Sequence, residues 1–281
     1  MIYILYPASS LLIYKLRLTR VIFVFLVGSG ISIISFILQS LTRTPLASEY
    51  TLGISSGVAF FASIAYILDL NPLFFSIIGG ISITTLLVIF IRKRLGSNSF
   101  VLIGISLSIF FGSGISFINY ITSFKSSQVL SRWIFGSFSF YSWCEIITLI
   151  IMYIFLIISF YFYLPKIILI SISPVYEEIL GKNFKTQITF MVFIIGIFIS
   201  FLSTFVGPVP FFGLVVSNII RIIFKSNMIY TFFSLIASGS VLVLLDFISK
   251  NLLIFEELPI GILTGIVCLP LVLVSIKKSF Y

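Results

Sequence analysis

The chain has 281 residues, of which 60% are hydrophobic and 9% are charged, whereas roughly 25% of the residues of soluble domains are charged. This composition excludes an ordinary soluble domain and indicates an all-α membrane protein, because uncharged stretches of about 20 residues recur along the chain. A membrane β-barrel is disfavoured, since barrel strands alternate apolar and polar residues and these stretches are continuous. The net charge of +9 is explained by basic residues at the inner membrane face, so no nucleic acid binding is expected.

The N-terminal segment Met1–Tyr14 is apolar but contains Pro7. As a helix it would reach roughly 21 Å, which is less than the ~30 Å hydrocarbon core of a bilayer. We therefore expect an interfacial segment or the end of a membrane span. A basic cluster that contains Arg17 and Arg20 follows it.

Nine apolar stretches after this cluster are expected to form a single transmembrane domain, which comprises residues 1–281. All but Phe211–Phe224 are long enough to cross a bilayer. A corner is predicted at Gly207–Pro210, because two prolines remove backbone donors and break a helix. The expected spans are Val21–Leu41, Leu52–Leu70, Pro72–Ile91, Ser99–Ile121, Trp143–Leu164, Gln187–Val206, Phe211–Phe224, Met228–Phe247 and Leu258–Ile276.

Five charged residues interrupt the apolar pattern between Lys166 and Lys185. Because a charge at the bilayer centre costs at least ~2.5–3.5 kcal/mol, we expect this segment to lie in water, as a loop over residues 166–187. Its middle is predicted to form a short helix with Ser173 as the N-cap, acids near the positive helix end and Gly181 at the stop. A compact charged loop on a membrane domain indicates a surface for a partner protein.

The basic residues predict the orientation of the chain. With the spans given above, 11 Lys and Arg residues fall on one side of the membrane and six on the other. The positive-inside rule then places the 166–187 loop and the C-terminus in the cytoplasm. The same assignment leaves Arg17 and Arg20 outside, against the trend, which suggests a functional reason for these two charges.

Enzymatic chemistry is not expected. The stretch Gly53–Gly57 matches the G-x-S-x-G pattern of hydrolases, but the chain has no histidine and cannot form a Ser-His pair. Neither a metal-binding H-E-x-x-H sequence nor a phosphate-binding glycine loop is present. The two cysteines, Cys144 and Cys268, are expected to be structural thiols. We therefore expect no cofactor or metal bound by this chain.

Asp246 is the acid that stands out inside an apolar stretch. An intramembrane acid is a functional candidate by default, but Lys250 follows one helical turn later and is a suitable partner. A structural, paired charge near the outer face is the favoured interpretation. Ion-coupled transporters usually carry several such groups, so a single one argues that the energy for any transport is supplied from outside the membrane domain.

Six segments, taken in order along the chain, resemble the FecCD permeases, which are membrane subunits of ATP-binding-cassette (ABC) importers for iron-siderophores, haem and cobalamin. The resemblance includes the L-R-L-P-R, N-P-L-A, W-x-x-G-S and E-L-P-V-G patterns of that family. Departures from the family pattern are Thr19, Thr44 and the pair Ser217-Asn218, where relatives have Pro, Asn and Pro-His. The segments are Leu16–Gly28, Leu38–Gly57, Trp133–Ser137, Glu177–Asn183, Gly207–Arg221 and Glu257–Thr264.

The resemblance implies the fold of a type II ABC importer permease in the bacterial cytoplasmic (inner) membrane. The family has ten spans, so the first would be missing or reduced to Met1–Tyr14. The implied partners are two ATP-binding subunits, which hold ATP and Mg, a second permease subunit (the same or a paralogue), a substrate-binding protein or lipoprotein, and membrane lipid.

The resemblance also implies three groups of site residues. The residues that would couple to the ATP-binding subunit are Glu177, Glu178, Leu180, Gly181, Lys182 and Asn183. The residues that would dock the binding protein are Arg17, Arg20 and Lys250. The cytoplasmic gate would comprise Thr44, Pro45 and Leu46.

The function expected from these observations is ATP-driven import of an iron-siderophore, haem or similar metal chelate through a permease subunit. One alternative is an ion-coupled secondary transporter, which would need ion sites at broken helices and inverted repeats. A second alternative is an inactive, shortened permease that acts as a membrane assembly factor.

Overall fold

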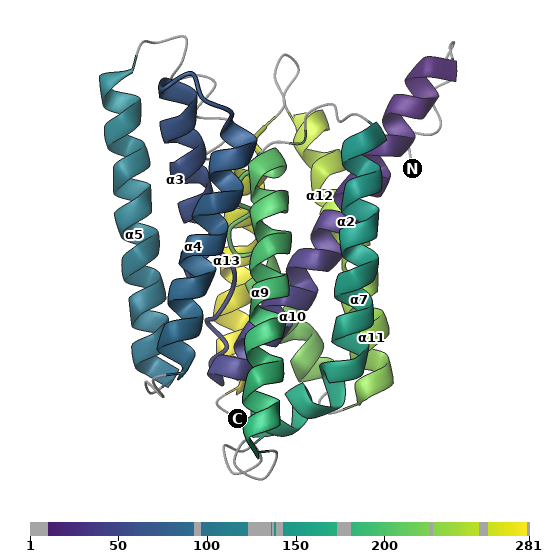
Figure 1. Ribbon diagram of the computed structural model, residues 1–281. Coiled ribbons are helices and arrows are strands. Elements are labelled where there is room, and N and C mark those ends of the chain that lie inside the picture. Colours follow the sequence, from purple (N-terminus) through teal and green to yellow (C-terminus); the bar gives the residue numbers. More distant parts are fainter. Residues whose placement is uncertain are drawn as a thin grey trace.

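The computed structural model describes residues 11–92, 97–122, 136, 138, 143–172, 181–224, 227–252 and 258–279. Its regular structure in these ranges is helical throughout and forms a bundle (Figure 1). The ten helices are α2 (Leu11–Thr42), α3 (Ile54–Ile67), α4 (Pro72–Arg92), α5 (Ser97–Ile121), α7 (Trp143–Ile172), α9 (Gly181–Val206), α10 (Phe212–Phe224), α11 (Met228–Ala237), α12 (Gly239–Leu252) and α13 (Ile260–Ser279).

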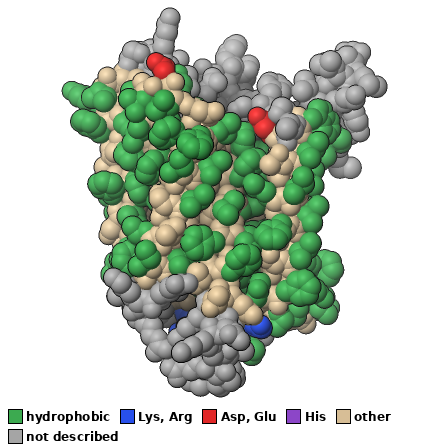
Figure 2. All heavy atoms as spheres, in the orientation of Figure 1, with side chains coloured by type: hydrophobic (Ala, Val, Ile, Leu, Met, Phe, Trp, Pro, Cys, Tyr) green, Lys and Arg blue, Asp and Glu red, His purple; other side chains and the backbone are tan. Residues whose placement is uncertain are grey.

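Six stretches within the described residues are long and apolar enough to cross a membrane, and α3 and α10 are shorter apolar helices. Together with α13, these elements correspond to the nine expected stretches and confirm the all-α membrane fold. Hydrophobic side chains cover the visible sides of the bundle, and the charged side chains in this view lie near its two ends (Figure 2). The six long stretches are Arg17–Thr42, Pro72–Phe90, Val101–Ile121, Glu145–Leu169, Thr189–Val206 and Met228–Leu252.

Several helices extend beyond the expected boundaries. Helix α2 begins at Leu11 and therefore contains the basic cluster. Helix α7 continues through Pro165 to Ile172, and α9 begins at Gly181. The expected span Met228–Phe247 consists instead of α11 and α12, which meet at a turn at Ser238.

The prediction of a full-length span at Leu52–Leu70 is wrong, because α3 has only 14 residues. The chain before it, residues 43–53, has no helix and packs against the middle of α2, where the Ser35 hydroxyl donates to Glu49 at 2.7 Å. Irregular backbone at membrane depth is tolerated where it is buried in protein and its polar groups are bonded. Here the Ile54 and Ser55 amides donate to the Glu49 carbonyl, and Gly53 turns the chain with a φ of 81°.

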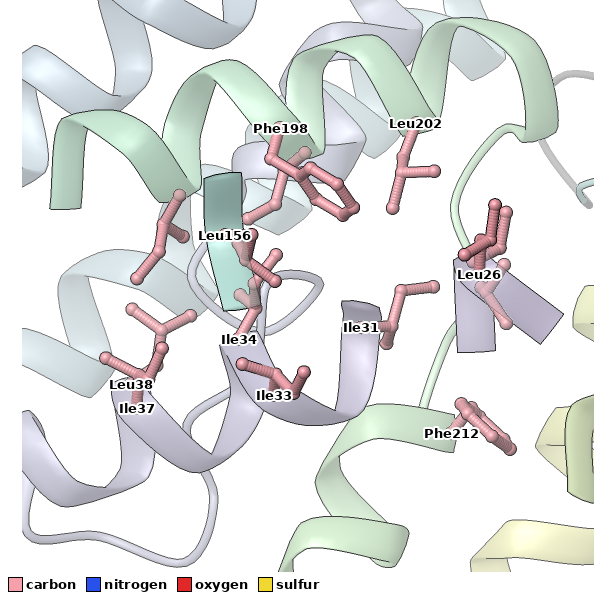
Figure 3. Packing of buried hydrophobic residues seen from close by; sticks show 14 of the residues in the cluster. Leu26, Ile31, Ile33, Ile34, Ile37, Leu38, Leu156, Phe198, Leu202 and Phe212 are labelled. Atoms are coloured by element: carbon pink, nitrogen blue, oxygen red, sulfur yellow. The ribbon is translucent and has the colours of Figure 1, made fainter. Parts of the chain in front are cut away.

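Helix α2 forms the centre of the core and contacts α7, α10, α11 and α12. Its side chains Ile31 and Ile34 point toward Phe198 and Leu202 of α9, with Phe212 of α10 beside them (Figure 3). Small residues allow the close approach: a Cβ on Gly28 would lie 2.7 Å from the Cβ of Leu242 in α12. Helix α2 also buries several hydroxyl side chains, among them Ser29, Ser32 and Ser40, whose hydroxyls donate to carbonyls of the preceding turn of the same helix.

The helix ends divide into two groups at opposite ends of the bundle. In Figure 1 the C-terminal end lies at the lower end together with the last turn of α7 and the first turn of α9, whereas the N-terminal end of α2 lies at the upper end. This grouping agrees with the expectation that the 166–187 segment and the C-terminus lie on the same side.

Candidate functional site

A groove of about 590 Å³ runs between α5, the segment 43–53 and the start of α10. Most of its wall comes from one face of α5, where small and hydroxyl side chains lie beside Ile105 and Ile109. The residues that line it are Tyr50, Thr51, Ile105, Ser108, Ile109, Gly112, Ser113, Ser116 and Phe211.

Hydrogen bonds and a close backbone approach hold the groove wall together. The Ser108 hydroxyl donates to the Tyr50 carbonyl at 2.8 Å, which fixes the segment 43–53 against α5. A Cβ on Gly104 would lie 2.8 Å from the Cα of Leu52, so only glycine permits this contact. By contrast, a Cβ on Gly112 would meet no atom within 4 Å, and this glycine therefore opens the groove.

The groove differs in chemistry from the surrounding surface of α5. Leu102, Phe110 and Phe117 are each more than 60% exposed on that helix, as suits contact with lipid. Between them, Ser113 and Ser116 present hydroxyls, and the groove is completed by Tyr50 and Thr51. The hydroxyls give this wall some polar bonding groups among apolar ones, which the flanking leucine and phenylalanines do not offer.

The predicted gate, Thr44–Leu46, lies in the turn directly after α2 and is bound to α10. The Pro45 carbonyl accepts hydrogen bonds from the Asn218 amide at 2.8 Å and from the Gln39 amide at 3.3 Å. The Leu46 carbonyl accepts from the Thr51 hydroxyl at 2.8 Å. Pro45 and Leu46 are exposed, so the turn is fixed through its backbone while its side chains remain accessible.

Arg221 strengthens the same contact between α10 and α2. Its guanidinium donates to the Ser40 hydroxyl at 2.8 Å and lies 4.6 Å from the centre of the Phe36 ring. A guanidinium over an aromatic face is an attractive cation–π arrangement. Helix α10 continues through Ser217 and Asn218 without interruption, and Asn218 supplies one of the bonds to the gate turn. Sequence reasoning did not anticipate this role for Asn218.

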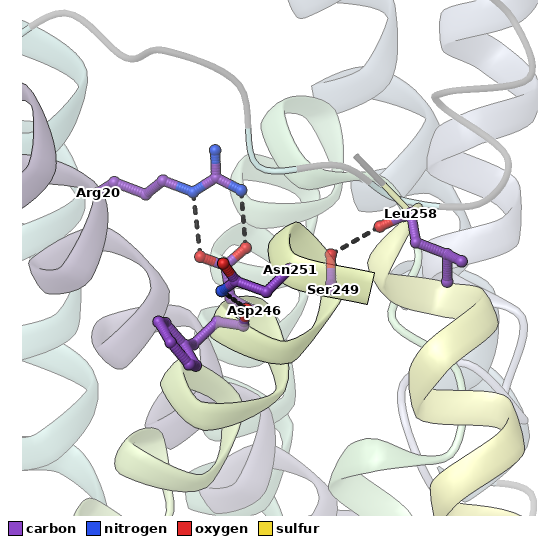
Figure 4. A network of polar contacts seen from close by, with 6 residues as sticks. Arg20, Asp246, Ser249, Asn251 and Leu258 are labelled. Carbon is purple, nitrogen blue, oxygen red and sulfur yellow. Dashed lines mark hydrogen bonds and ion pairs between the residues drawn. The ribbon is translucent and has the colours of Figure 1, made fainter. Parts of the chain in front are cut away.

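At the opposite end of α2, Arg20 and Asp246 form an ion pair (Figure 4). The two guanidinium bonds to the carboxylate measure 2.7 and 3.0 Å, and the side chains are only 13% and 12% exposed. Asp246 therefore has a structural partner in α2, in agreement with the favoured interpretation of this acid, and the pair ties α2 to α12. Arg17 and Lys250 are half-buried and also make interactions within the chain.

The coupling residues are only partly within the described chain. Glu177, Glu178 and Leu180 lie outside the described residues, while Gly181, Lys182 and Asn183 form the beginning of α9. Of the expected loop 166–187, residues 166–172 complete α7 and residues 181–187 belong to α9. The Lys166 ammonium donates to the Gln187 side chain at 3.0 Å and so joins the two helices at this end of the bundle.

Glu49 is a buried acid that sequence reasoning missed. It is 3% exposed, and it belongs to a segment that was expected to connect two spans. The available signal was its isolation, because Glu49 is the only charged residue between Arg43 and Asp69. In the described part of the chain, no three His, Cys, Asp or Glu residues lie close enough together to hold a metal ion.

The many long apolar helices define a multi-pass membrane protein, and the groove along α5 combines hydroxyl and apolar side chains. Residues 3–278 match the FecCD transport family. The chain belongs to the FecCD transport family, and the resemblance seen in the sequence motifs is confirmed.

Relatives and solved structures agree with this assignment. The vitamin B12 import system permease protein BtuC of Yersinia enterocolitica is 26% identical over 279 residues, which cover 94% of this chain and 81% of that protein. BtuC of Serratia proteamaculans is also 26% identical, over 275 residues.

Two solved structures share the fold. An inward-facing conformation of a protein assigned to the metal-chelate type of ABC transporter has a TM-score of 0.84 at 22% identity and covers 97% of this chain and 90% of that one. PsaBC from Streptococcus pneumoniae, in complex with Fab, has a TM-score of 0.64 at 16% identity and covers 98% of this chain and 95% of that one.

Proposed function

We propose that this chain is the permease subunit of an ABC importer and conducts a metal chelate into the cytoplasm. The observation that carries the proposal is the match of nearly the whole chain to the FecCD transport family. The relatives include permeases named for vitamin B12 import, and a structural neighbour is assigned to the metal-chelate type. An iron-siderophore, haem or a cobalamin is therefore the substrate class to test first.

The groove along α5 is proposed as one wall of the translocation path, with a second permease subunit as the other wall. Its volume of about 590 Å³ and its hydroxyl-bearing lining support a path for a bulky, partly polar solute. The turn Thr44–Leu46, directly after α2, is proposed as the cytoplasmic gate, in which the exposed Pro45 and Leu46 side chains would close such a path.

The 166–187 segment is proposed to transmit the energy of ATP hydrolysis from the ATP-binding subunit to the membrane domain. An ATP-binding subunit that docks on Glu177–Asn183 would move the adjoining ends of α7 and α9, which the Lys166–Gln187 bond joins. Both helices pack on α2, so their displacement would be transmitted to the core and the gate turn. This is a population shift between two packed arrangements, driven by ATP hydrolysis in a separate subunit. The segment and the C-terminus are accordingly placed in the cytoplasm of a bacterial inner-membrane protein.

Uptake measurements test the proposal. Cells that lack their own chelate permeases would receive this chain together with the ATP-binding subunit and binding protein from the same source. Radiolabelled iron-siderophore, haemin and cyanocobalamin would be offered separately. We expect accumulation of one of them, and loss of accumulation when the ATP-binding subunit carries a substitution that prevents hydrolysis.

The same assay separates the alternatives. Uptake that survives the hydrolysis-deficient partner but collapses with an ionophore would establish a secondary transporter. Absence of uptake of any chelate, together with failure to co-purify an ATP-binding subunit, would support a membrane assembly factor. Deletion of Glu177–Lys182 is expected to abolish co-purification of the ATP-binding subunit while leaving the chain in the membrane.

A further inference from the structure

Glu49 lies at a junction of three parts of the chain. It belongs to the segment 43–53, and the Ser35 hydroxyl in the middle of α2 donates to its carboxyl group at 2.7 Å. The corner between α9 and α10 closes the third side, through Val206, Gly207 and Val209. The proposed function uses none of the chemistry of this acid.

A small, partly enclosed cavity adjoins the Glu49 carboxyl. Its volume is about 10 Å³, and its polar lining consists of Glu49, Ser55 and Ser203. Both serines are less than 10% exposed, and neither hydroxyl donates to another residue in the part of the chain that the structure describes. One water molecule needs a cavity of roughly 10–15 Å³ and two to four polar partners. The site therefore has the size and the bonding groups for one water.

Electrostatics favours a neutral carboxyl group at this position. The remaining side chains that line the cavity are apolar, and Glu49 is its only titratable residue among those described. No Lys or Arg of the described chain forms an ion pair with it. Arg221, the basic group that α10 brings to α2, bonds Ser40, which lies five residues and roughly 7.5 Å along the helix from Ser35. The Ser35 hydroxyl favours the ionised form, but a buried carboxylate with a neutral donor and no cation of the described chain beside it is neutralised by protonation rather than left charged.

Two non-helical segments, residues 43–53 and 207–211, meet at Glu49; they are called the two helix breaks below. One break ends at Gly53, with a φ of 81°, and the other contains Gly207 and Phe211, with φ values of 78° and 64°. On the side of the groove, the rings of Tyr50 and Phe211 touch, with their centres 6.2 Å apart. Tyr50 is also the titratable side chain next to Glu49 along the chain, and it lines the groove rather than the cavity.

Close packing holds the Ser35–Glu49 bond in place. A Cβ on Gly213, in the first turn of α10, would lie 2.2 Å from the Ser35 hydroxyl oxygen. In Figure 3, Ile31 lies between Leu202 of α9 and Phe212 of α10, the helices on either side of the corner. A relative movement of the two breaks would therefore change the surroundings of Glu49 directly.

We propose that Glu49 is a proton-binding site that reports the packing of the two helix breaks. It is protonated and bonded to one enclosed water when Tyr50 and Phe211 are in contact. It releases the proton to water from the groove when the breaks separate. Because ionisation stabilises only the separated arrangement, raising the pH shifts the population toward it. The inference goes beyond the proposed function and does not depend on which solute is carried.

Infrared spectroscopy of the purified chain in lipid nanodiscs tests the protonation state. A protonated carboxyl group has a carbonyl stretching band of its own, outside the amide bands. We expect such a band at neutral pH, its loss in Glu49→Gln, and a change in its frequency in Ser35→Ala, which keeps the acid but removes its donor. A spectrum of Glu49→Gln identical to that of the parent chain would overturn the proposal.

A spin label in the groove tests the linkage to conformation. The label is attached at Ser113→Cys, in a chain whose native cysteines are replaced by alanine, and its accessibility to a water-soluble paramagnetic complex is followed across pH. We expect accessibility to rise with pH in the parent and to stay constant in Glu49→Gln. Asp69→Asn, which removes an exposed acid, is the matched control and should keep the pH response.

Either of two results would contradict this linkage: a pH response that survives in Glu49→Gln, or a parent chain that shows none. If Glu49→Gln failed to fold, a frequency change of the carbonyl band in Ser35→Ala would still assign the band to Glu49, and no change would contradict the assignment. Neither experiment requires a chelate, an ATP-binding subunit or a binding protein. Failure of this inference is therefore distinguishable from failure of the proposed function.

Discussion

Helices α2 and α5 are both long and apolar, but α2 is buried within the chain and α5 is mostly exposed. Their apolar stretches have mean hydropathies of 2.7 and 2.1, yet 83% of an 18-residue window of the first and only 28% of such a window of the second is buried within this chain. Helix α2 is surrounded by protein, whereas α5 presents bulky side chains outward and a stripe of small ones to the groove. Hydropathy therefore identifies a helix that can enter the membrane, but it does not decide whether that helix faces protein, lipid or a solute path.

The largest loss of stability is expected when the ion pair between Arg20 of α2 and Asp246 of α12 is broken. Asp246→Ala leaves the mostly buried Arg20 without its carboxylate, and breaking such a pair typically costs about 3–5 kcal/mol. We expect a drop of that order in the free energy of unfolding, measured by denaturant titration in mixed micelles. The double variant Arg20→Leu with Asp246→Leu should recover much of the loss, because it removes both charges. A double variant that is no better than the single one would contradict this explanation.

The next largest loss of stability is expected when a bulky side chain is introduced into the close packing around α2. Gly28→Val places a side chain where a Cβ would already lie 2.7 Å from the Leu242 Cβ. Overpacking of this kind typically costs about 1–3 kcal/mol, and we expect a value near the upper end. The same micelle titration measures it. Gly112→Val in α5, where a Cβ would meet no atom within 4 Å, is the control and should unfold like the parent chain.

The bond between α10 and the gate turn is expected to have a smaller effect on stability. Asn218→Ala removes the 2.8 Å bond to the Pro45 carbonyl, and loss of a buried hydrogen bond costs about 1–3 kcal/mol. Because the Gln39 amide still donates to that carbonyl, we expect a loss at the lower end of that range. Protease access at the gate turn should rise more than the global unfolding energy falls. Equal changes in both would show that the bond stabilises the bundle as a whole.

The smallest effect on stability, coupled to a large effect on transport, is expected in the groove. Gly112→Leu places a bulky side chain beside Ser113, at a position where a Cβ meets no atom within 4 Å. The unfolding energy should change by less than about 0.5 kcal/mol, as for other surface substitutions, while uptake of the transported chelate should fall at least several-fold. Leu102→Ile, on the outward face of α5, is the control. Unchanged uptake in Gly112→Leu would remove the groove from the proposed path.

The sequence predicted features that depend on single residues or on neighbours along the chain. The apolar stretches were located because the cost of transferring each side chain into lipid is a property of that side chain. The corner at Gly207–Pro210 was predicted from local backbone chemistry, and the structure has no helix there. Asp246 was expected to be a paired structural charge with Lys250, one turn along its own helix, whereas the structure pairs it with Arg20, 226 residues away.

The two features that the sequence did not predict, the short helix α3 and the burial of Glu49, share a physical reason. Leu52–Leu70 has the composition of a full span, but the chain stays irregular up to Gly53, because Ser35 of α2 and Ser108 of α5 bind its polar groups. Such bonds between segments that are distant in the chain are not encoded in any local window. The acid Glu49 was overlooked for the same reason, since only the folded chain surrounds it.

The amino-acid sequence alone determined that this is a helical membrane protein and identified its family, because both follow from side-chain chemistry in linear order. The tertiary structure decided which helix is central, where the groove lies and which acid is buried. Those features depend on the packing of side chains from separate helices. The hydrophobicity of each helix does not determine that packing, because lipid tails are as apolar as the side chains of a neighbouring helix.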